Sequence, residues 1–305
     1  MTLTRRTFLT TSSLALAGLA ARPAWAATEM ALGEAKLITL SDGHLSLPRE
    51  FIFAPMPEEE LGPVLADFDL AEGALTPPCN VTLLQHGDRN VLFDVGSGQF
   101  FMPSAGELLD ALDAAGLTPE DITDVVFTHG HPDHLWGVLD DFDEPLFANA
   151  SHMMGRVEWD YWWNPETIDT IGEARASMAS GAKRRLEILE GSVEFFDDGE
   201  EILPGVAAVA TYGHTQGHMS FEIRQGNSAA MIVGDAIGNH HVAFARPQWP
   251  SGSDHVAEQA AETRLALLDR LANEQMPLIG YHLPDGGLGR VERDGDAYRY
   301  VADLA

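Results

Sequence analysis

The stretch Thr128-His-Gly-His-Pro-Asp-His134 (THGHPDH) places four potential metal ligands within seven residues: His129, His131, Asp133 and His134. Neither a helix nor a strand would present all four on one face, whereas a loop that follows a strand can do so. The preceding run, Ile-Thr-Asp-Val-Val-Phe over 122–127, is typical of that strand, and Gly130 and Pro132 interrupt regular structure. Imidazole with carboxylate favours zinc, iron, manganese or nickel over calcium or magnesium. The stretch therefore predicts a metal site rather than a His-rich surface loop.

The composition is that of a soluble globular protein, with 45% hydrophobic and 21% charged residues in 305 positions. A net charge of −29 argues against nucleic acid, anionic membrane surfaces and polyanionic substrates as partners, and we interpret the acidity as a source of solubility. Cys79 is the one cysteine of the sequence, which rules out an intrachain disulfide. Because it follows two prolines and opens a strand-like run, we expect a buried structural thiol rather than a nucleophile.

The first 26 residues are typical of an export signal. Arg5-Arg6 precedes Phe8-Leu9, an apolar run covers 14–21, and Ala24-Trp-Ala26 offers a cleavage site. The paired arginines predict the twin-arginine route, whose machinery exports folded proteins; an ordinary secretory signal or an uncleaved anchor is the alternative. The apolar run is too short to span a bilayer stably. We expect cleavage, a periplasmic or secreted protein, and a single catalytic domain over 27–305.

Polar residues follow strand-like runs at five places along the chain, and these are Asp94, the segment 129–134, His214, Asp235 and His282. Loops at the ends of strands commonly hold functional side chains over a rigid sheet. A carboxylate buried at Asp94 needs a partner, and the free N–H of a ligating imidazole would supply it. Hairpins in the two outer portions, with helices between them, predict two face-to-face sheets covered by helices.

Periodicity and turn signals predict the individual elements. Ser104 with Glu107 predicts a capping box, and Ser253-Asp254 predicts a helix cap. The predicted strands are 35–40 and 44–47 (a hairpin at Asp42-Gly43), 80–86, 90–95, 145–148, 193–196, 206–211, 219–224, 229–233, 277–280, 289–292 and 297–301; the predicted helices are 104–115, 135–139, 151–163, 166–190 and 255–273; and 51–78 is predicted to be irregular.

Large aromatic residues gather in the tract Trp159-Asp-Tyr-Trp-Trp163. Such a tract packs a core or forms a wall for an apolar substrate, and both readings stay open. The candidate pocket residues are Phe100, Phe101, Trp136, Trp159, Trp162 and Trp163. Exposed aromatics also suggest a homodimer. We expect the substrate to be decided by this tract and by the irregular segment 51–78.

The His-x-His-x-Asp-His motif, the turn Gly213-His-Thr-Gln-Gly-His218 and the step Gly234-Asp235 together resemble the metallo-β-lactamase superfamily, in order from Asp94 to His282. The resemblance implies an α+β fold, an αββα sandwich of two mixed sheets flanked by helices, with two metal ions at the sheet edge. It implies that one ion is held by His129, His131 and His214, the other by Asp133, His134 and His282, and that Asp235 bridges them. It implies supporting roles for Asp94, Thr128 and His218.

Within that superfamily the chain looks most like the methyl parathion hydrolase-like and N-acyl-homoserine lactonase-like branch. The ending His282-Leu-Pro-Asp-Gly-Gly-Leu-Gly-Arg290, Tyr298 and the signal carry this likeness. Lactamases lack the bridging carboxylate or place a Cys at the site, so Asp235, with Cys79 elsewhere in the sequence, disfavours β-lactam hydrolysis. His131 excludes the flavin-partnered di-iron type, which carries a Glu there.

These residues predict a dinuclear metal-dependent hydrolase that cleaves a neutral, apolar ester, lactone or phosphotriester. A hydroxide bridging two divalent metal ions would attack, with Asp133 and Asp235 as the catalytic carboxylates. Zinc is expected first, with iron, manganese or cobalt as alternatives. The alternative functions are a mononuclear iron persulfide dioxygenase-type oxidoreductase and a glyoxalase II-type thioesterase. The scarcity of lysines, Lys36 and Lys183 alone, disfavours the thioesterase, which needs basic residues for glutathione.

Overall fold

The computed structural model describes residues 28–68, 70 and 73–302. The predicted export signal over 1–26 lies outside these residues and stays a prediction. No helix among the described residues is long and apolar enough to cross a membrane.

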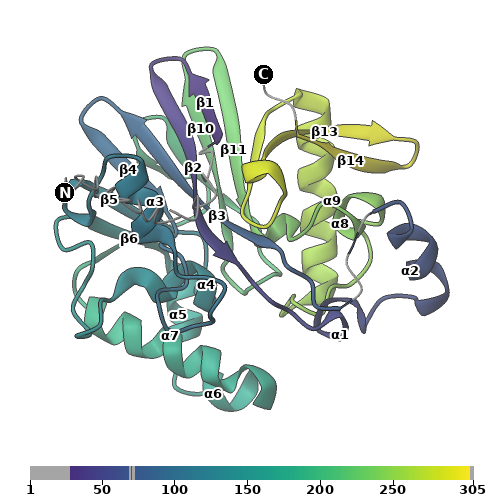
Figure 1. Cartoon of the computed structure of the whole chain (residues 1–305), viewed down its shortest axis with the longest axis horizontal. Coiled ribbons are helices and arrows are strands. Elements are labelled where there is room, and N and C mark those ends of the chain that lie inside the picture. The colour runs from purple at the N-terminus through teal and green to yellow at the C-terminus, as the bar shows by residue number, and fades with distance from the viewer. Residues whose placement is uncertain (1–27, 69, 71–72, 303–305) are drawn as a thin grey trace, which may run out of the picture.

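Two seven-stranded sheets form the centre of the described structure (Figure 1). The first sheet contains, in spatial order, β1 Thr28–Leu32, β2 Ala35–His44, β3 Pro78–His86, β4 Arg89–Phe93, β5 Asp124–Phe127, β6 Ser151–Gly155 and β7 Val193–Phe196. The second contains β14 Ala297–Val301, β13 Leu288–Asp294, β12 Leu278–Gly280, β11 Ser228–Gly234, β10 Met219–Gln225, β9 Val206–Ala210 and β8 Glu201–Leu203. Both sheets are mixed, because β4 to β7 run parallel to one another and β11 is parallel to β12.

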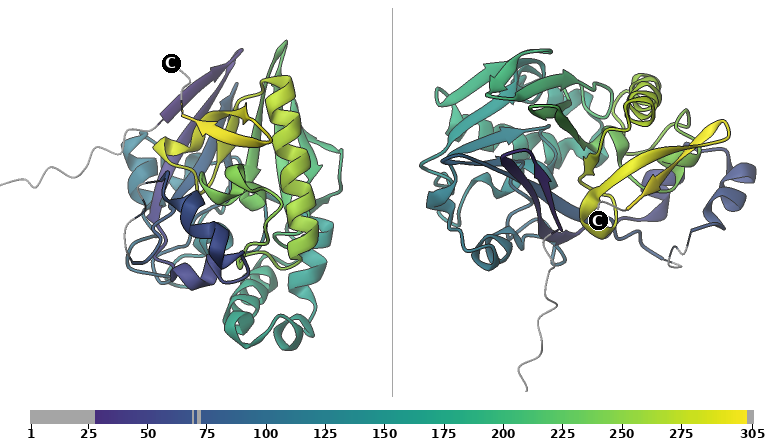
Figure 2. Two further views of the ribbon diagram at one scale, coloured as in Figure 1. Left: turned by 90° about the vertical axis from the view of Figure 1, so that its right-hand side faces the viewer. Right: turned by 90° about the horizontal axis from the view of Figure 1, so that it is seen from above.

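Helices cover the outer face of each sheet, and Figure 2 shows α9 lying along one flank. The helices are α1 Arg49–Phe53, α2 Glu58–Leu65, α3 Leu108–Ala114, α4 Pro132–Leu135, α5 Arg156–Trp163, α6 Thr167–Thr170, α7 Ala176–Leu189, α8 Val242–Ala245 and α9 Ala257–Glu274. Short 3₁₀ turns are η1 Pro119–Asp121, η2 Trp136–Val138, η3 Glu173–Arg175, η4 Asp235–Ile237 and η5 Asp285–Gly287. The predicted αββα sandwich is confirmed.

Three apolar layers hold the sandwich together. Between the sheets, the Phe93 and Phe221 rings lie 5.1 Å apart within a cluster drawn from both. A second cluster packs α3, α5 and α7 on the first sheet, and a third packs α8 and α9 on the second. A smaller cluster seats α1 and α2 against α8 and Trp249. The segment predicted to be irregular over 51–78 thus contains α2 and the end of α1, which pack onto the second half of the molecule.

The predicted hairpin at Asp42-Gly43 is wrong, since β2 continues through it with an irregularity between Ser41 and His44. The Asp42 side chain is buried instead, and it accepts hydrogen bonds from the backbone N–H groups of Ser97 and Leu108. This contact also explains why the predicted capping box fails. The helix starts at Leu108 rather than Ser104, and its first N–H is satisfied by a carboxylate 66 residues away in the sequence.

Four other predicted elements differ from the structure. Residues 151–155 form strand β6, so the predicted helix over 151–163 keeps only its second part, α5. The predicted helix over 166–190 breaks where Gly172 has a φ of 96°, a backbone that glycine adopts readily. Residues 145–148 form only an isolated bridge from Pro145 to Leu139. The predicted helix over 135–139 is replaced by α4 and η2, which begin earlier, at Pro132.

Candidate metal centre

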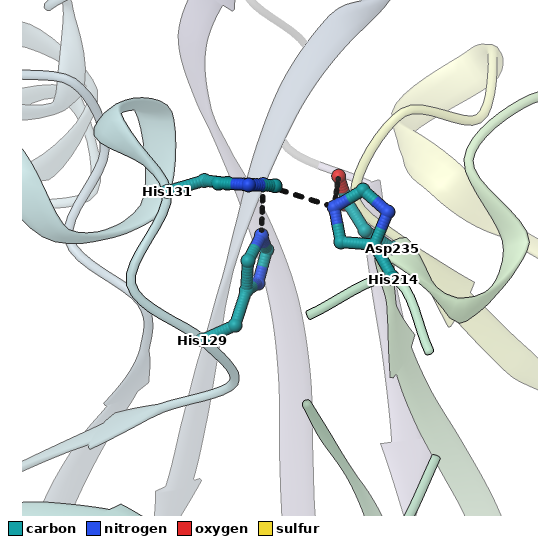
Figure 3. A group of neighbouring side chains, drawn as sticks. All are labelled: His129, His131, His214 and Asp235. Carbon is teal, nitrogen blue, oxygen red and sulfur yellow. Dashed lines mark hydrogen bonds and ion pairs between the residues drawn. The ribbon is translucent and has the colours of Figure 1, made fainter. Parts of the chain in front are cut away.

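Five strand ends deliver polar side chains to one edge of the sandwich, as the sequence pattern predicted. Asp94 follows β4, the segment 128–134 follows β5, His214 follows β9, Asp235 follows β11 and His282 follows β12. Figure 3 shows His129, His131, His214 and Asp235 converging there. The segment 128–134 is not a loop throughout, since its second half forms the first turn of α4.

One group of ligand atoms is centred on His131. Its Nδ1 lies 3.0 Å from Nε2 of His129 and 3.0 Å from Nε2 of His214 (Figure 3). The His214 Nε2 is also 3.3 Å from Oδ2 of Asp235. Two ligands that each lie about 2.0–2.1 Å from one tetrahedral zinc are about 3.4 Å apart, so the observed separations fit a shared ion. These four residues can therefore hold one metal.

A second group of ligand atoms adjoins the first through Asp235. Nε2 of His134 lies 3.3 Å from Oδ1 of Asp235 and 3.4 Å from Oδ2 of Asp133. Nε2 of His282 lies 3.2 Å from Oδ2 of Asp133 and 3.3 Å from Oδ2 of Asp235. Oδ2 of Asp133, Nε2 of His134 and Oδ1 of Asp235 are buried and have no hydrogen-bond partner among the described residues. Buried polar atoms left in this state are costly unless something such as a cation satisfies them.

Burial and mutual contact set the charges of the candidate ligands. Burial lowers the pKa of His129 and His131 well below the usual value for histidine. Burial alone would raise the pKa of Asp235, but the neighbouring His282 and His134 hold it well below its usual range. Neutral imidazoles and ionised carboxylates are the states in which these side chains bind metals, so His129, His131 and Asp235 are in ligating states at neutral pH. Burial opposes the charged form of His134 and His282, but Asp235 outweighs it and holds the pKa of both well above its usual value, so these two imidazoles release a proton when they bind a metal.

Asp94 contacts both Thr128 and His134 of the segment 128–134. Its carboxylate accepts hydrogen bonds from the Thr128 N–H and the Thr128 hydroxyl, each at 2.8 Å. It also lies 2.8 Å from Nδ1 of His134, the imidazole partner that the sequence pattern called for. The Thr128 oxygen lies 2.9 Å from Nδ1 of His129. A proton on Nδ1 of each histidine satisfies both contacts, and Nε2 of each then faces the candidate metal positions.

His218 lies just outside the two ligand groups. Its Nε2 accepts a hydrogen bond from the backbone N–H of Asp235 at 2.9 Å, and its Nδ1 lies 2.8 Å from the Thr211 hydroxyl. Burial lowers the pKa of His218 to about 3, which keeps Nε2 available as an acceptor. His218 thereby fixes the backbone of the carboxylate that adjoins both groups.

Two supporting carboxylates escaped the sequence analysis. Asp254, predicted to cap a helix, instead lies 3.0 Å from Nδ1 of His214 and accepts a hydrogen bond from Arg264 at 2.7 Å. Glu158, within the stretch predicted as a plain helix, accepts from the Gly130 and Gly217 N–H groups at 2.8 and 2.9 Å. No local pattern marks either residue, because Asp254 lies 40 residues from His214 in the sequence, and Glu158 lies 28 residues from Gly130 and 59 from Gly217.

A cavity of about 540 Å³ opens onto the ligand groups and is lined by His131, Asp133, His214, Asp235 and His282. Much of its apolar lining comes from the 45–78 region and consists of Leu45, Leu47, Phe51, Ile52, Leu70 and Leu75. His240 and His241 also face it. Within the segment 51–78, Phe51, Ile52, Leu70 and Leu75 line the cavity, and the expectation that this segment decides the substrate stays a prediction.

Of the six candidate pocket residues, Phe101 alone lines this cavity in the described structure, so the structure favours core packing, one of the two readings left open for the aromatic tract. Trp159 and Trp162 are buried in the core, where Trp159 stacks on Trp163 and the Trp162 indole donates to Glu158. Trp136 packs under the Arg185 guanidinium, 4.3 Å from the ring centroid, and Phe100 is 82% exposed. Helix α5 turns its aromatic side chains toward the first sheet and α7, which leaves the cavity wall to the 45–78 region.

Cys79 is buried, as predicted, but it is not remote from the site. Its sulfur and the ligand atoms of Asp133 and His282 all lie within 4.8 Å of one another. Burial raises the pKa of the thiol to about 11. Its separation from the motif in the sequence was therefore a poor guide to its place in the fold.

Comparisons with known proteins agree with this geometry. A family model described as the metallo-beta-lactamase superfamily matches residues 75–282. The N-acyl homoserine lactonase AttM of Agrobacterium fabrum is 28% identical over 127 residues, which cover 41% of this chain and 44% of AttM. An N-acyl homoserine lactonase of a Bacillus species is 26% identical over 196 residues, 64% of this chain and 66% of the relative. Each match spans less than two thirds of the relative.

Solved structures extend the likeness over most of the chain. AidC, a dizinc quorum-quenching lactonase solved with the product N-hexnoyl-L-homoserine, superposes with a TM-score of 0.86 and 26% identity, covering 92% of this chain and 98% of AidC. The hydrolase AbOPH superposes with a TM-score of 0.83 at 24% identity, covering 90% and 96%, and supports the fold alone. The family match, which spans more than half of the sequence, shows that this chain belongs to the metallo-beta-lactamase superfamily.

Proposed function

We propose that this protein is a metal-dependent hydrolase that opens the ring of N-acyl-homoserine lactones. It would use two divalent cations, and zinc is the metal we expect. The observation that carries the proposal is the pair of adjoining ligand groups that share Asp235 at the floor of a largely apolar cavity. Lactonase relatives by sequence and a dizinc lactonase among the structural neighbours support the substrate class and the metal.

The ligand chemistry fits two zinc ions. Five imidazoles and two carboxylates offer nitrogen and oxygen donors, which zinc accepts readily. Three buried atoms without hydrogen-bond partners, on Asp133, His134 and Asp235, point into the second group. The chemistry that divalent cations would supply at this site is a more acidic water and a polarised substrate carbonyl.

The residues of the chain would orient the substrate and the ions. The Asp235 carboxylate contacts His214 of the first group and both His134 and His282 of the second, so it would adjoin a cation held by either group. Tyr281 donates its hydroxyl hydrogen to the backbone oxygen of Asp133 and so fixes that residue. The apolar wall that includes Leu47, Phe51 and Leu75 would take the acyl chain and exclude water from it. Arg175 is the one Arg or Lys among the described residues that line the cavity, and together with the apolar wall this favours a neutral substrate over a glutathione thioester.

The test is a hydrolysis panel on zinc-reconstituted protein, with metal content measured on the same samples. The panel contains hexanoyl-homoserine lactone, an aryl ester, a phosphotriester, a β-lactam and a glutathione thioester. We expect two zinc ions per chain, fastest ring opening of the lactone, and loss of that activity in Asp235→Asn but not in the exposed control Asp113→Asn. A fully loaded protein that leaves the lactone intact would refute the proposed substrate, and one iron per chain in the protein as purified, before reconstitution, would favour the dioxygenase alternative.

A further inference from the structure

We propose that His255 is a positioning residue that holds His131 with its Nδ1 turned toward the metal centre. Nε2 of His131 lies 2.9 Å from Nε2 of His255. The other nitrogen of His131, Nδ1, is the atom that lies 3.0 Å from both His129 and His214. Nδ1 of His131 therefore faces the candidate metal position, and His255 contacts the other ring nitrogen, Nε2.

The protons along this contact can be assigned from chemistry alone. A neutral imidazole carries one N–H, so a His131 that offers Nδ1 to a metal must carry its hydrogen on Nε2 and donate it. Nε2 of His255 then accepts, and the hydrogen of His255 must lie on Nδ1. That nitrogen is 3.2 Å from Oε1 of Gln216, an acceptor. With these proton positions, each contact in the series from His131 through His255 to Gln216 pairs one donor with one acceptor.

The backbone places His255 for this role. Its N–H donates to the carbonyl oxygen of His214 at 3.0 Å, and Gln216 belongs to the same turn. Its ring packs 5.7 Å from Trp162 and 5.8 Å from Tyr161, between centroids. The contact therefore ties the loop of His131, after β5, to the turn that carries His214, after β9.

Comparison with the other ligand histidines strengthens the assignment. In each, the nitrogen that faces away from the candidate metals has a partner in this structure: Thr128 for His129, Asp94 for His134, Asp254 for His214 and the carbonyl of Pro78 for His282. His255 fills the corresponding place for His131. Partners of this kind fix the ring orientation and tautomer, and their loss typically costs about 10–100-fold in metal affinity.

The inference rests on the proposed metal centre but not on the proposed substrate. The test compares zinc-loaded wild type with His255→Gln, His255→Leu and the exposed control His44→Gln. Gln can present an amide oxygen to His131, whereas Leu fills similar space without an acceptor. Zinc affinity is measured by competition with a chromophoric chelator, and ¹H–¹⁵N NMR of the imidazoles reports which nitrogen of His131 carries the proton.

We expect His255→Leu to bind one of the two zinc ions about 10–100-fold more weakly, and His255→Gln and His44→Gln to remain close to wild type. In wild type the NMR spectrum should show a protected Nε2–H on His131, and the Leu variant should lose that protection. Equal affinities in Leu and wild type, equal losses in Leu and Gln, or a His131 proton on Nδ1 in the zinc-loaded wild type would each overturn the proposal. Zinc binding without lactone hydrolysis would refute only the proposed substrate, whereas a wild type that binds no zinc would overturn both.

Discussion

Replacing Glu158 by Gln should destabilise the protein, because both oxygens of this buried carboxylate are fully engaged. Oε1 accepts from the Gly130 N–H and the Trp162 indole N–H, and Oε2 accepts from the Thr215 hydroxyl and the Gly217 N–H. Glu158 is 0% exposed, so water cannot replace any of these bonds. The four donors come from three separate segments, two of which carry candidate metal ligands.

The cost follows from the donors that Gln cannot satisfy. Its NH₂ must face one pair of donors, and the Thr215 side is less unfavourable because a hydroxyl can rotate and accept. The Gly217 N–H is then left without an acceptor, at about 1–3 kcal/mol, and the remaining bonds lose their charged acceptor. We expect Glu158→Gln to lower the free energy of unfolding by about 2–4 kcal/mol.

Urea unfolding of the metal-free proteins measures this change directly, and Glu187→Gln on α7 makes a matched control. Glu187 has a 55% exposed side chain, and its one ion pair within the described part of the chain is with Lys183, at 3.5 Å, so its replacement should cost less than about 1 kcal/mol. Zinc affinity should fall in Glu158→Gln as well, since Gly130 and Gly217 adjoin His129, His131 and His218. A Glu158→Gln variant as stable as Glu187→Gln would refute the reasoning.

Two further predictions concern buried titratable groups beside the first sheet. Burial raises the pKa of Asp42 from 3.8 to about 6, so between these pH values the native protein binds a proton that the unfolded chain has released. The proton uptake by Asp42 stabilises the native state fully below pH 4, and this stabilisation, up to about 3 kcal/mol, is lost as pH rises through 6. We therefore expect the free energy of unfolding in urea to change less between pH 4.5 and pH 7.5 in Asp42→Asn than in wild type, and equal changes in the two proteins would contradict this. The Cys79 thiol, with no exposed surface and a pKa of about 11, should react with a thiol reagent at pH 8 only when urea unfolds the chain, so rapid reaction of the native protein would count against the structure.

The candidate ligands could be predicted from the sequence because their positions follow a local pattern. An apolar strand ends, a polar side chain follows, and a turn comes next, at Asp94, His214, Asp235 and His282 as in the stretch 128–134. The period of the strands and the chemistry of the turns are both encoded by neighbouring residues. Strand ends at one edge of a sandwich then meet because the sheets are continuous, so the sequence determined the fold class and the set of residues that converge.

The surroundings of those residues were decided only by the tertiary structure. Asp42 caps a helix 66 residues away, Glu158 and Asp254 bond to partners across the fold, and His255 meets His131 at a separation of 124 residues. The sequence left core packing and a pocket wall open for the aromatic tract, and the fold places it in the core, while the 45–78 region supplies much of the apolar lining. A helix with large side chains on several faces does not reveal which face meets the sheet, and a hydrogen bond to a distant partner leaves no periodic trace in the sequence. The motif at 128–134 thus specified the ligands locally, whereas packing between remote segments specified what orients them and what shapes the cavity above them.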